Sequence, residues 1–277
     1  MAGIPHTHTI VCDYRGFGIS TLDNLPHIPT ESGIITDAIS IVSYVLHDLK
    51  HPSSRTVILG QSLGTAVSTA AALYFTDPNS DLLPKDIVKP SPAIKEAQSF
   101  AGIVLAAPFT TVPELLKTYR IKGIIPVFSP LQNYPKIENY LRSKIIDLWP
   151  TLPRLQALLS AARDTSTPIH ISILHARNDQ EINFRISEAV YAPLESMMLV
   201  EEGASSTEER RSIHGGERVK RGAFAYRRVE NAKGERSIEL EIVRYGGHSE
   251  GVGWAQVGLA VRRAFKTKVY RPGLDVE

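Results

Sequence analysis

The sequence predicts an α/β fold with a mainly parallel sheet and helices on both of its faces. Two observations carry this prediction: short apolar runs of strand length alternate with helix-length segments, and the middle runs are almost continuously apolar. Alternation of this kind is typical of β-α-β units joined by right-handed crossovers. An almost unbroken apolar run is expected for a strand that is covered on both faces. We therefore expect one domain over residues 1–277.

Each expected strand is a short run rich in β-branched and apolar residues that ends at a turn. The first run, HTIVCDY at 8–14, ends in the Gly-rich turn RGFG, and the second is RTVILGQ at 55–61. Three later runs complete the set: SFAGIVLAAPF (99–109), PIHISILHA (168–176) and RSIELEIVRYG (236–246). Helical patterns separate or follow these strands: GIITDAISIVSYVLHDLK (33–50), LGTAVSTAAALYF (63–75) and SEGVGWAQVGLAVRRAFK (249–266).

Two stretches interrupt this alternation. Residues 110–165 hold several prolines and short apolar helices, and they are too long for a plain crossover between strands. We expect a helical cap over the strand ends there, the alternative being extra helices that only pack. Residues 201–236 carry dense charge of both signs, which predicts a solvated, partly disordered insertion. The alternative for that insertion is peripheral membrane contact through acidic lipid headgroups.

Composition excludes several classes of protein. The 31 basic and 29 acidic residues give a net charge of +2, which argues against a dedicated nucleic-acid surface. Cys12 is the single cysteine, so an internal disulfide framework is impossible, as suits a reducing compartment. No apolar run approaches the ~20 residues of a membrane span, and the start resembles no signal peptide. We expect a cytoplasmic protein, or a membrane-associated one if an anchor precedes Met1.

The pattern G-x-S-x-G occurs at residues 60–64, GQSLG, between an expected strand and an expected helix. A sharp turn there strains the backbone of Ser62 and exposes its hydroxyl at the end of the strand. Gly60 and Gly64 are expected to let neighbouring backbone approach closely. The N–H of Leu63, at the start of the helix, is expected to face a developing oxyanion. This context favours a nucleophile over a small turn residue.

A serine nucleophile needs a base, and the base needs an orienting acid. After such an elbow, the acid and then the histidine are expected past later strands. Asp179 follows the strand 168–176, and His248 follows the strand 236–246 on the Gly-rich turn YGGH. Because carboxyl ends of parallel strands lie at one edge of a sheet, both residues are expected beside Ser62.

Other candidates for these roles are weaker. His175 and His170 lie within an apolar strand and are expected to be core histidines. His214 lies in the charged insertion, and Asp164 precedes its strand instead of following it. Glu181 is a fallback acid. His6 and His8 have too few nearby carboxylates or cysteines to predict a metal site.

The motifs DYRGFGIS, GQSLGT, APFT, LHARND and YGGH occur in this order, and the chain thereby resembles the α/β-hydrolase superfamily. It is most similar to the branch of lysophosphatidylserine lipases and monoacylglycerol-type lipases. The resemblance implies a triad of Ser62, Asp179 and His248, with Asp13 and Arg15 fixing loops near the site. It also implies an acylglycerol or lysophospholipid substrate, with the cap covering the acyl chain, and no cofactor or metal.

The sequence departs from the family pattern at its start. The strand before DYRG corresponds to the family's fourth, and the third strand, whose H-G loop gives a second oxyanion N–H, has no counterpart in residues 1–12. One hypothesis is a shortened gene product, and another is that residues 8–13 pair directly with 55–60. We expect an ester hydrolase, with a catalytically impaired binding protein as the alternative. A peptidase of the same fold is a third hypothesis.

Overall fold

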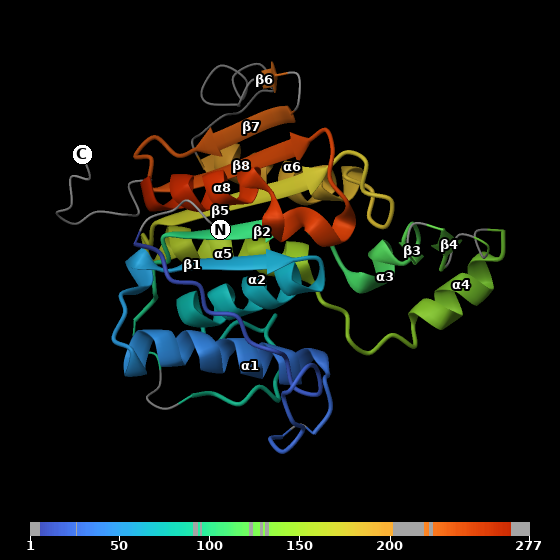
Figure 1. Ribbon diagram of the computed structural model, residues 1–277, viewed down its shortest axis with the longest axis horizontal. Coiled ribbons are helices and arrows are strands. Elements are labelled where there is room, and N and C mark those ends of the chain that lie inside the picture. Colours follow the sequence, from blue (N-terminus) through green and yellow to red (C-terminus); the bar gives the residue numbers. More distant parts are fainter. Residues whose placement is uncertain are drawn as a thin grey trace.

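A six-stranded sheet forms the centre of the computed structural model (Figure 1). The structure describes residues 6–25, 27–90, 94, 96–121, 124–127, 130, 133–201, 219–221 and 224–266. The strand order is β1-β2-β5-β8-β7-β6. Four neighbouring strands are parallel: β1 (Val57–Gln61), β2 (Gly102–Ala106), β5 (Ile169–Ala176) and β8 (Arg236–Val243). Two antiparallel strands complete the sheet: β7 (Phe224–Glu230) and β6 (Val219–Arg221).

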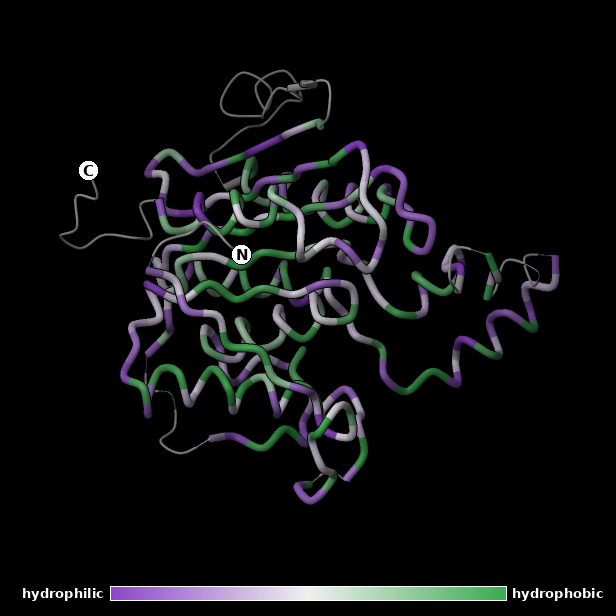
Figure 2. Tube along the Cα trace, in the orientation of Figure 1, coloured by the Kyte–Doolittle hydropathy of each residue, from purple (hydrophilic) through white to green (hydrophobic). Residues whose placement is uncertain are grey.

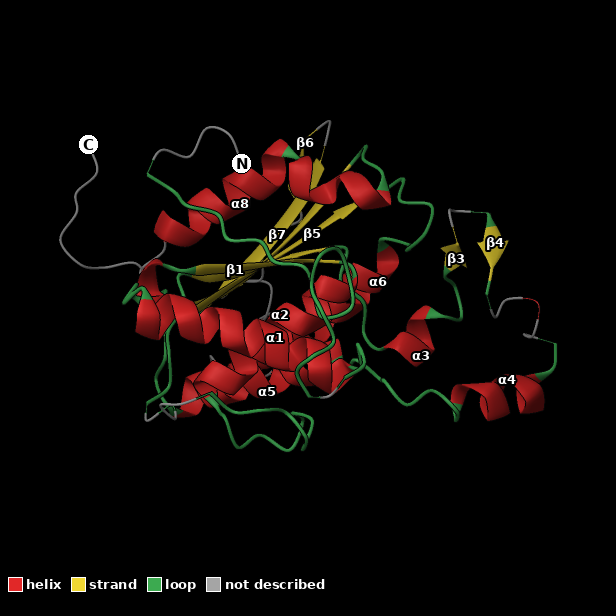
Figure 3. Cartoon of the chain, turned by 60° about the horizontal axis from the view of Figure 1, so that its bottom comes forward, coloured by secondary structure: helices red, strands yellow, loops and turns green. Residues whose placement is uncertain are grey.

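Helices cover both faces of this sheet, as Figure 3 shows from the side. On one face lies α8 (Ala255–Lys266), and on the other lie α2 (Leu63–Thr76) and α6 (Arg185–Glu201). A second layer packs on α2, formed by α1 (Glu31–Ser43) and α5 (Thr151–Asp164). The predicted α/β class with helices on both faces is confirmed.

The core explains why the sequence alternates as it does. Every residue of β2 is buried, and the tube in Figure 2 is predominantly green along β1 and β2. The Ala-rich helix α2 is almost wholly buried between the sheet and the outer helices. On the opposite face, a Cβ built on Gly102 would lie 2.6 Å from Cβ of Ala264, so α8 packs directly against β2. No helix of the described chain is long and apolar enough to cross a bilayer.

The prediction that residues 8–14 form a strand is wrong. Residues 8–14 run as coil past β1 to the loop before α1, and Val11 is 86% exposed (Figure 1). They form no ladder with 57–61, because β1 pairs with β2 alone among the described strands. The hypothesis of direct pairing between 8–13 and 55–60 is therefore also wrong. An apolar run becomes a strand only where a neighbouring strand shares its backbone hydrogen bonds, and no described strand does so for residues 8–14.

Part of the predicted charged insertion, 201–236, belongs to the sheet. Residues 224–230 form β7, which pairs antiparallel with β8. The charges there are paired: Arg227 binds both carboxylate oxygens of Glu195 on α6, at 2.8 and 2.6 Å. Mixed charge thus marks a strand with ionic partners, which composition alone does not show. Residues 202–218, where we predict disorder, lie outside the described residues.

The segment predicted as a cap, 110–165, divides into two parts. The first is an arm that projects from the body of the molecule in Figures 1 and 3, formed by α3 (Val112–Leu115), β3 (Arg120–Ile121), β4 (Ile125–Pro126) and α4 (Pro135–Arg142). The second is α5, which packs on α2. There Arg154, only 2% exposed, forms an ion pair of 2.7 Å with Glu31 of α1.

Candidate active site

Ser62 lies on the turn between β1 and α2 in a strained backbone conformation. Its φ of 52° and ψ of −122° fall outside the regions that non-glycine residues favour, at a cost of about 1–3 kcal/mol. The turn is so tight that a Cβ on Gly60 would lie 2.2 Å from the carbonyl oxygen of Gly64. Ser62 precedes α2 without capping it through its side chain. The hydroxyl is therefore free to point away from the helix, as the G-x-S-x-G pattern predicts.

The two glycines of the turn are not equivalent, which corrects the expectation for Gly64. A Cβ on Gly64 would meet nothing closer than the hydroxyl of Tyr14 at 3.6 Å, an ordinary contact. The close approach concerns Gly60, whose Cβ position is filled by the backbone of Gly64. A side chain is thus excluded at Gly60 and sterically tolerated at Gly64.

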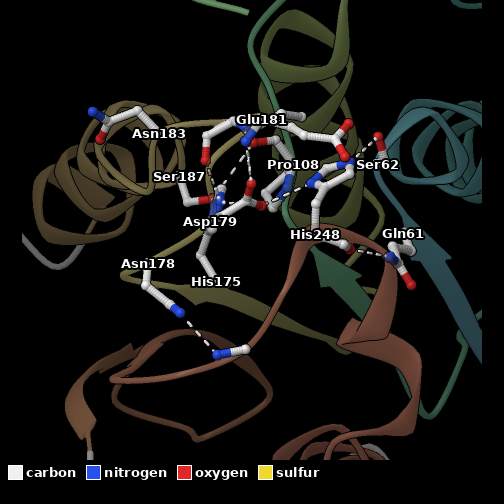
Figure 4. A network of polar contacts seen from close by, with 12 residues as sticks. Gln61, Ser62, Pro108, His175, Asn178, Asp179, Glu181, Asn183, Ser187 and His248 are labelled. Carbon is white, nitrogen blue, oxygen red and sulfur yellow. Dashed lines mark hydrogen bonds and ion pairs between the residues drawn. The ribbon is translucent and has the colours of Figure 1, made fainter. Parts of the chain in front are cut away.

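The structure brings Ser62, His248 and Asp179 together in one line (Figure 4). Nε2 of His248 lies 3.0 Å from Oγ of Ser62, and Nδ1 lies 2.7 Å from Oδ2 of Asp179. The sheet register explains the meeting. Gln61 is level with Ala106, Ala106 with Leu174, and Ala176 with Val243. The three side chains therefore come from loops past the carboxyl ends of parallel strands.

The loop that carries His248 is anchored from two sides. The side-chain amide of Gln61 donates a hydrogen bond to the carbonyl oxygen of His248. The side-chain oxygen of Asn178 accepts a 2.8 Å hydrogen bond from the N–H of Gly246, whose φ is 153°. These anchors come from the residues directly before Ser62 and Asp179. The sequence pattern does not reveal either of them.

The carboxylate of Asp179 is buried and surrounded by donors. Its side chain is 1% exposed, and Oδ1 accepts hydrogen bonds from the N–H groups of Glu181 and Ile182 at 2.8 and 3.0 Å. Oδ2 faces His248 and also Nε2 of His175, at 3.2 Å. Burial alone raises the pKa of Asp179. The hydrogen bonds from His175, His248 and Ile182 outweigh it, and they hold the pKa well below its ordinary value of 3.8.

The pKa of His248 also depends on burial acting against hydrogen bonding and charge, with the directions reversed. Burial alone lowers the pKa of its imidazole, because the side chain is only 10% exposed. The hydrogen bond to Asp179 and the negative charges of Asp179 and Glu181 favour the protonated ring. The net result is a pKa above the ordinary value of 6.5.

Within the described residues, the side chains of the weaker candidates form no hydrogen bond with Ser62, His248 or Asp179, with one exception. His170 is fully buried and bonds to Ser237 and Ser172, as a core histidine does. Glu181 accepts a hydrogen bond from the Tyr119 hydroxyl at 3.1 Å. Asp164 ends α5 and pairs with its neighbour Arg163, while His6 and His8 lie in the irregular segment at the start of the described chain. His214 lies outside the described residues.

The exception is His175. It is fully buried at the end of β5, as a core histidine would be, but its Nε2 faces Oδ2 of Asp179. The expectation of a buried core histidine is confirmed, and the hydrogen bond to Asp179 is a contact that this expectation did not include. The available signal was its place: it is the second-last residue of the strand, four residues before the acid.

Asp13 and Arg15 stabilise the loop that contacts the elbow. The side chain of Asp13 accepts the N–H of Ile19 at 3.2 Å. Arg15 is 6% exposed and binds Asp37 of α1 through its guanidinium at 2.7 Å and its backbone N–H at 3.0 Å. Tyr14, the residue between them in the sequence, has its hydroxyl near Gly64. None of these contacts involves the hydroxyl of Ser62 or the ring of His248.

Leu63 begins α2, and the N–H groups of a first helical turn have no acceptor within the helix. The N–H of Leu63 directly follows Ser62, and the positive end of the helix dipole favours negative charge at this point. The residue after Ser62 thus contributes a backbone N–H at the positive end of α2.

The parallel sheet, the strained strand-to-helix turn and the Ser-His-Asp line define an α/β-hydrolase fold. Residues 6–199 match the family described as serine aminopeptidase, S33, and the chain belongs to this family. No curated protein sequence matches the chain.

Solved structures with a similar arrangement share little sequence with this chain. An α/β hydrolase from Vibrio vulnificus is 13% identical with a TM-score of 0.49, over 85% of this chain and 57% of that one. An acylaminoacyl peptidase from Pyrococcus horikoshii is 14% identical with a TM-score of 0.43, over 89% of this chain and 30% of that one. An esterase from Exiguobacterium antarcticum is 14% identical with a TM-score of 0.38, over 91% and 79%. The chain thus spans just over half of the first protein and under a third of the second.

Proposed function

We propose that this protein is a serine hydrolase that cleaves carboxylic esters with an apolar acyl chain, such as acylglycerols or lysophospholipids. The observation that carries the proposal is the continuous line of hydrogen bonds from Ser62 through His248 to Asp179, with spacings of 3.0 and 2.7 Å. A serine hydroxyl gains nucleophilicity when a neutral imidazole accepts its proton and a buried carboxylate orients that imidazole.

The proposed reaction follows from this geometry. Oγ of Ser62 attacks the carbonyl carbon of the ester while Nε2 of His248 takes the hydroxyl proton. The negative charge on the carbonyl oxygen is stabilised by the N–H of Leu63. His248 then gives the proton to the leaving alcohol as the C–O bond breaks, which leaves an acyl-serine. Water attacks this acyl group in the same way and releases the acid.

The arm supports an apolar substrate. It exposes several large apolar side chains among polar ones, with Tyr134, Ile137 and Tyr140 between 51% and 61% exposed, and Ile146 in the segment after α4 is 91% exposed. The arm is also joined to the loop of Asp179, because the N–H of Arg120 donates to the carbonyl oxygen of Glu181 at 3.3 Å. An apolar segment fixed to the loop that bears the proposed acid is well placed to receive an acyl chain or a lipid surface. On this basis we propose that the protein belongs to the lipase-like branch and makes peripheral membrane contact.

A matched set of substrates tests the proposal. We expect hydrolysis of a long-chain monoacylglycerol and a lysophospholipid, and much slower cleavage of an aminoacyl p-nitroanilide. Cleavage of the aminoacyl p-nitroanilide tests the peptidase alternative, which the description of the family suggests. Faster cleavage of this amide than of the esters would contradict the ester proposal. A folded protein that neither cleaves these substrates nor reacts with a fluorophosphonate would instead be the impaired binding protein.

The pH dependence gives an independent prediction. His248 must be neutral to accept the proton of Ser62, so kcat/KM should fall as the pH drops through the pKa of His248. Because that pKa is raised, we expect the midpoint of the acid limb above pH 6.5. Initial rates across pH, with a neutral ester as substrate, measure it. A midpoint below the ordinary histidine value would contradict the interaction between His248 and Asp179.

A further inference from the structure

His175 makes a set of contacts that simple packing does not require. Its ring is fully buried at the carboxyl end of β5. Nε2 lies 3.2 Å from Oδ2 of Asp179 and 3.0 Å from the carbonyl oxygen of Ile182, and Nδ1 lies 2.6 Å from Oγ of Ser187 on α6. Both ring nitrogens are therefore satisfied, and one of them reaches the proposed acid (Figure 4).

The partners of His175 determine where its proton lies. Nε2 faces a carboxylate and a carbonyl, which only accept hydrogen bonds, so Nε2 must carry the hydrogen. Nδ1 lies 2.6 Å from the hydroxyl of Ser187, which also donates to the carbonyl oxygen of Pro108 at 3.4 Å. The ring is thus fixed from α6, and its Nε2–H is shared between the carbonyl oxygen of Ile182 and the carboxylate of Asp179.

The two oxygens of Asp179 are held in different ways. Two backbone N–H groups of its own loop fix Oδ1. Oδ2, which accepts the hydrogen bond from His248, has His175 as a second donor. His175 belongs to β5, so it ties Oδ2 to the rigid sheet. Without this donor, rotation of the carboxylate about its bond to Cβ would be restrained only by the N–H groups of Glu181 and Ile182 and by His248.

We propose that His175 is a positioning residue whose Nε2–H holds Oδ2 of Asp179 where it accepts the hydrogen bond from His248. The proposal rests on the proposed roles of Ser62, His248 and Asp179 in hydrolysis. It assigns His175 no contact with the substrate and no transfer of a proton. The hydrogen bond from His175 also contributes to the lowered pKa of Asp179, in agreement with a donor that favours the charged carboxylate.

The test compares His175→Phe, which keeps a ring and removes both nitrogens, with His175→Gln, whose amide nitrogen can donate from near the position of Nε2. We expect His175→Phe to lower kcat by about 10–100-fold, as loss of an orienting partner does at other sites, with KM unchanged. His175→Gln should recover a large part of this loss. His170→Phe is the matched control, because His170 lies on the same strand, is equally buried and does not touch Asp179; kcat of its folded fraction should not change.

A double-mutant cycle separates positioning from packing. If His175 acts through Asp179, His175→Phe should add little to the loss caused by Asp179→Asn, whereas a packing defect should add its full effect. If His175→Phe fails to fold, Ser187→Ala replaces it in the cycle. Ser187 bonds to Nδ1 of His175, so its removal should give a smaller loss of kcat. Additive losses, or equal kcat for the Phe and Gln variants, would overturn the proposal.

A readout without turnover separates this inference from the proposed function. The proton on Nδ1 of His248 is expected to give a protected NMR signal in the wild type and in Ser62→Ala, and a broadened or lost signal in His175→Phe. Absence of fluorophosphonate labelling in the wild type, together with this change, would reject the hydrolase proposal and retain the positioning role. An unchanged signal in His175→Phe would reject the positioning role whatever the activity.

Discussion

Ser62→Ala is expected to abolish hydrolysis, with a loss of about 10⁶-fold in kcat, the scale seen when the serine of a Ser-His-Asp hydrolase is removed. The substitution removes the single oxygen that lies 3.0 Å from Nε2 of His248, so no acyl-serine can form. Alanine has the same backbone and a smaller side chain, so the strained turn at φ 52° is retained. Initial rates with the best ester, and the mass of the intact protein after fluorophosphonate treatment, measure the result.

Ser68→Ala is the matched control for that experiment. Ser68 is a buried serine within α2, 7% exposed, and its hydroxyl lies close to the turn without a bond to His248 among the described contacts. We expect this variant to keep its activity and to form the phosphonate adduct. An adduct on Ser62→Ala would identify another nucleophile. Loss of labelling in both variants would indicate damage to the turn and not removal of the reacting atom.

The parts of the site that the sequence predicts are those set by local geometry and chain order. A strand, a Gly-flanked serine and a helix in succession predict the turn at Ser62, because only backbone sterics are involved. The parallel register then brings the loops of Asp179 and His248 to the same edge. These inferences require no knowledge of which side chains touch across the sheet.

The features that the sequence does not predict depend on distant partners. Residues 8–14 have the composition of a strand, but no described strand pairs with them. β7 has the composition of an exposed segment, yet Tyr226 and Arg227 pair with Glu239 and Glu195. His175 has the burial of a packed residue and the bonding of a functional one. In each case the presence or absence of a contact between distant residues decides the outcome, and the local pattern does not.

Asp179→Asn is expected to lower kcat by about 10⁴-fold, as the equivalent change does in another Ser-His-Asp hydrolase. The contacts of this chain explain why. Two backbone N–H groups face Oδ1, so the amide oxygen of the variant should occupy that position and the NH₂ group should face His248. Nδ1 of His248 must then accept a hydrogen bond, which leaves the ring proton on Nε2, facing Ser62. A protonated Nε2 cannot take the serine proton.

The pH profile distinguishes this mechanism from simple loss of structure. Asp179 raises the pKa of His248, so the neutral asparagine should move the acid limb of the remaining activity to lower pH. Glu181→Gln is the matched control, because it removes a nearby negative charge that also raises the pKa of His248, while its carboxylate accepts a hydrogen bond from Tyr119 and not from His248. A larger loss for Glu181→Gln than for Asp179→Asn would transfer the acid's role to Glu181. An acid limb that stays in place in Asp179→Asn would show that the short contact between Asp179 and His248 does not control the base, and the proposed mechanism would then need another source of orientation for the imidazole.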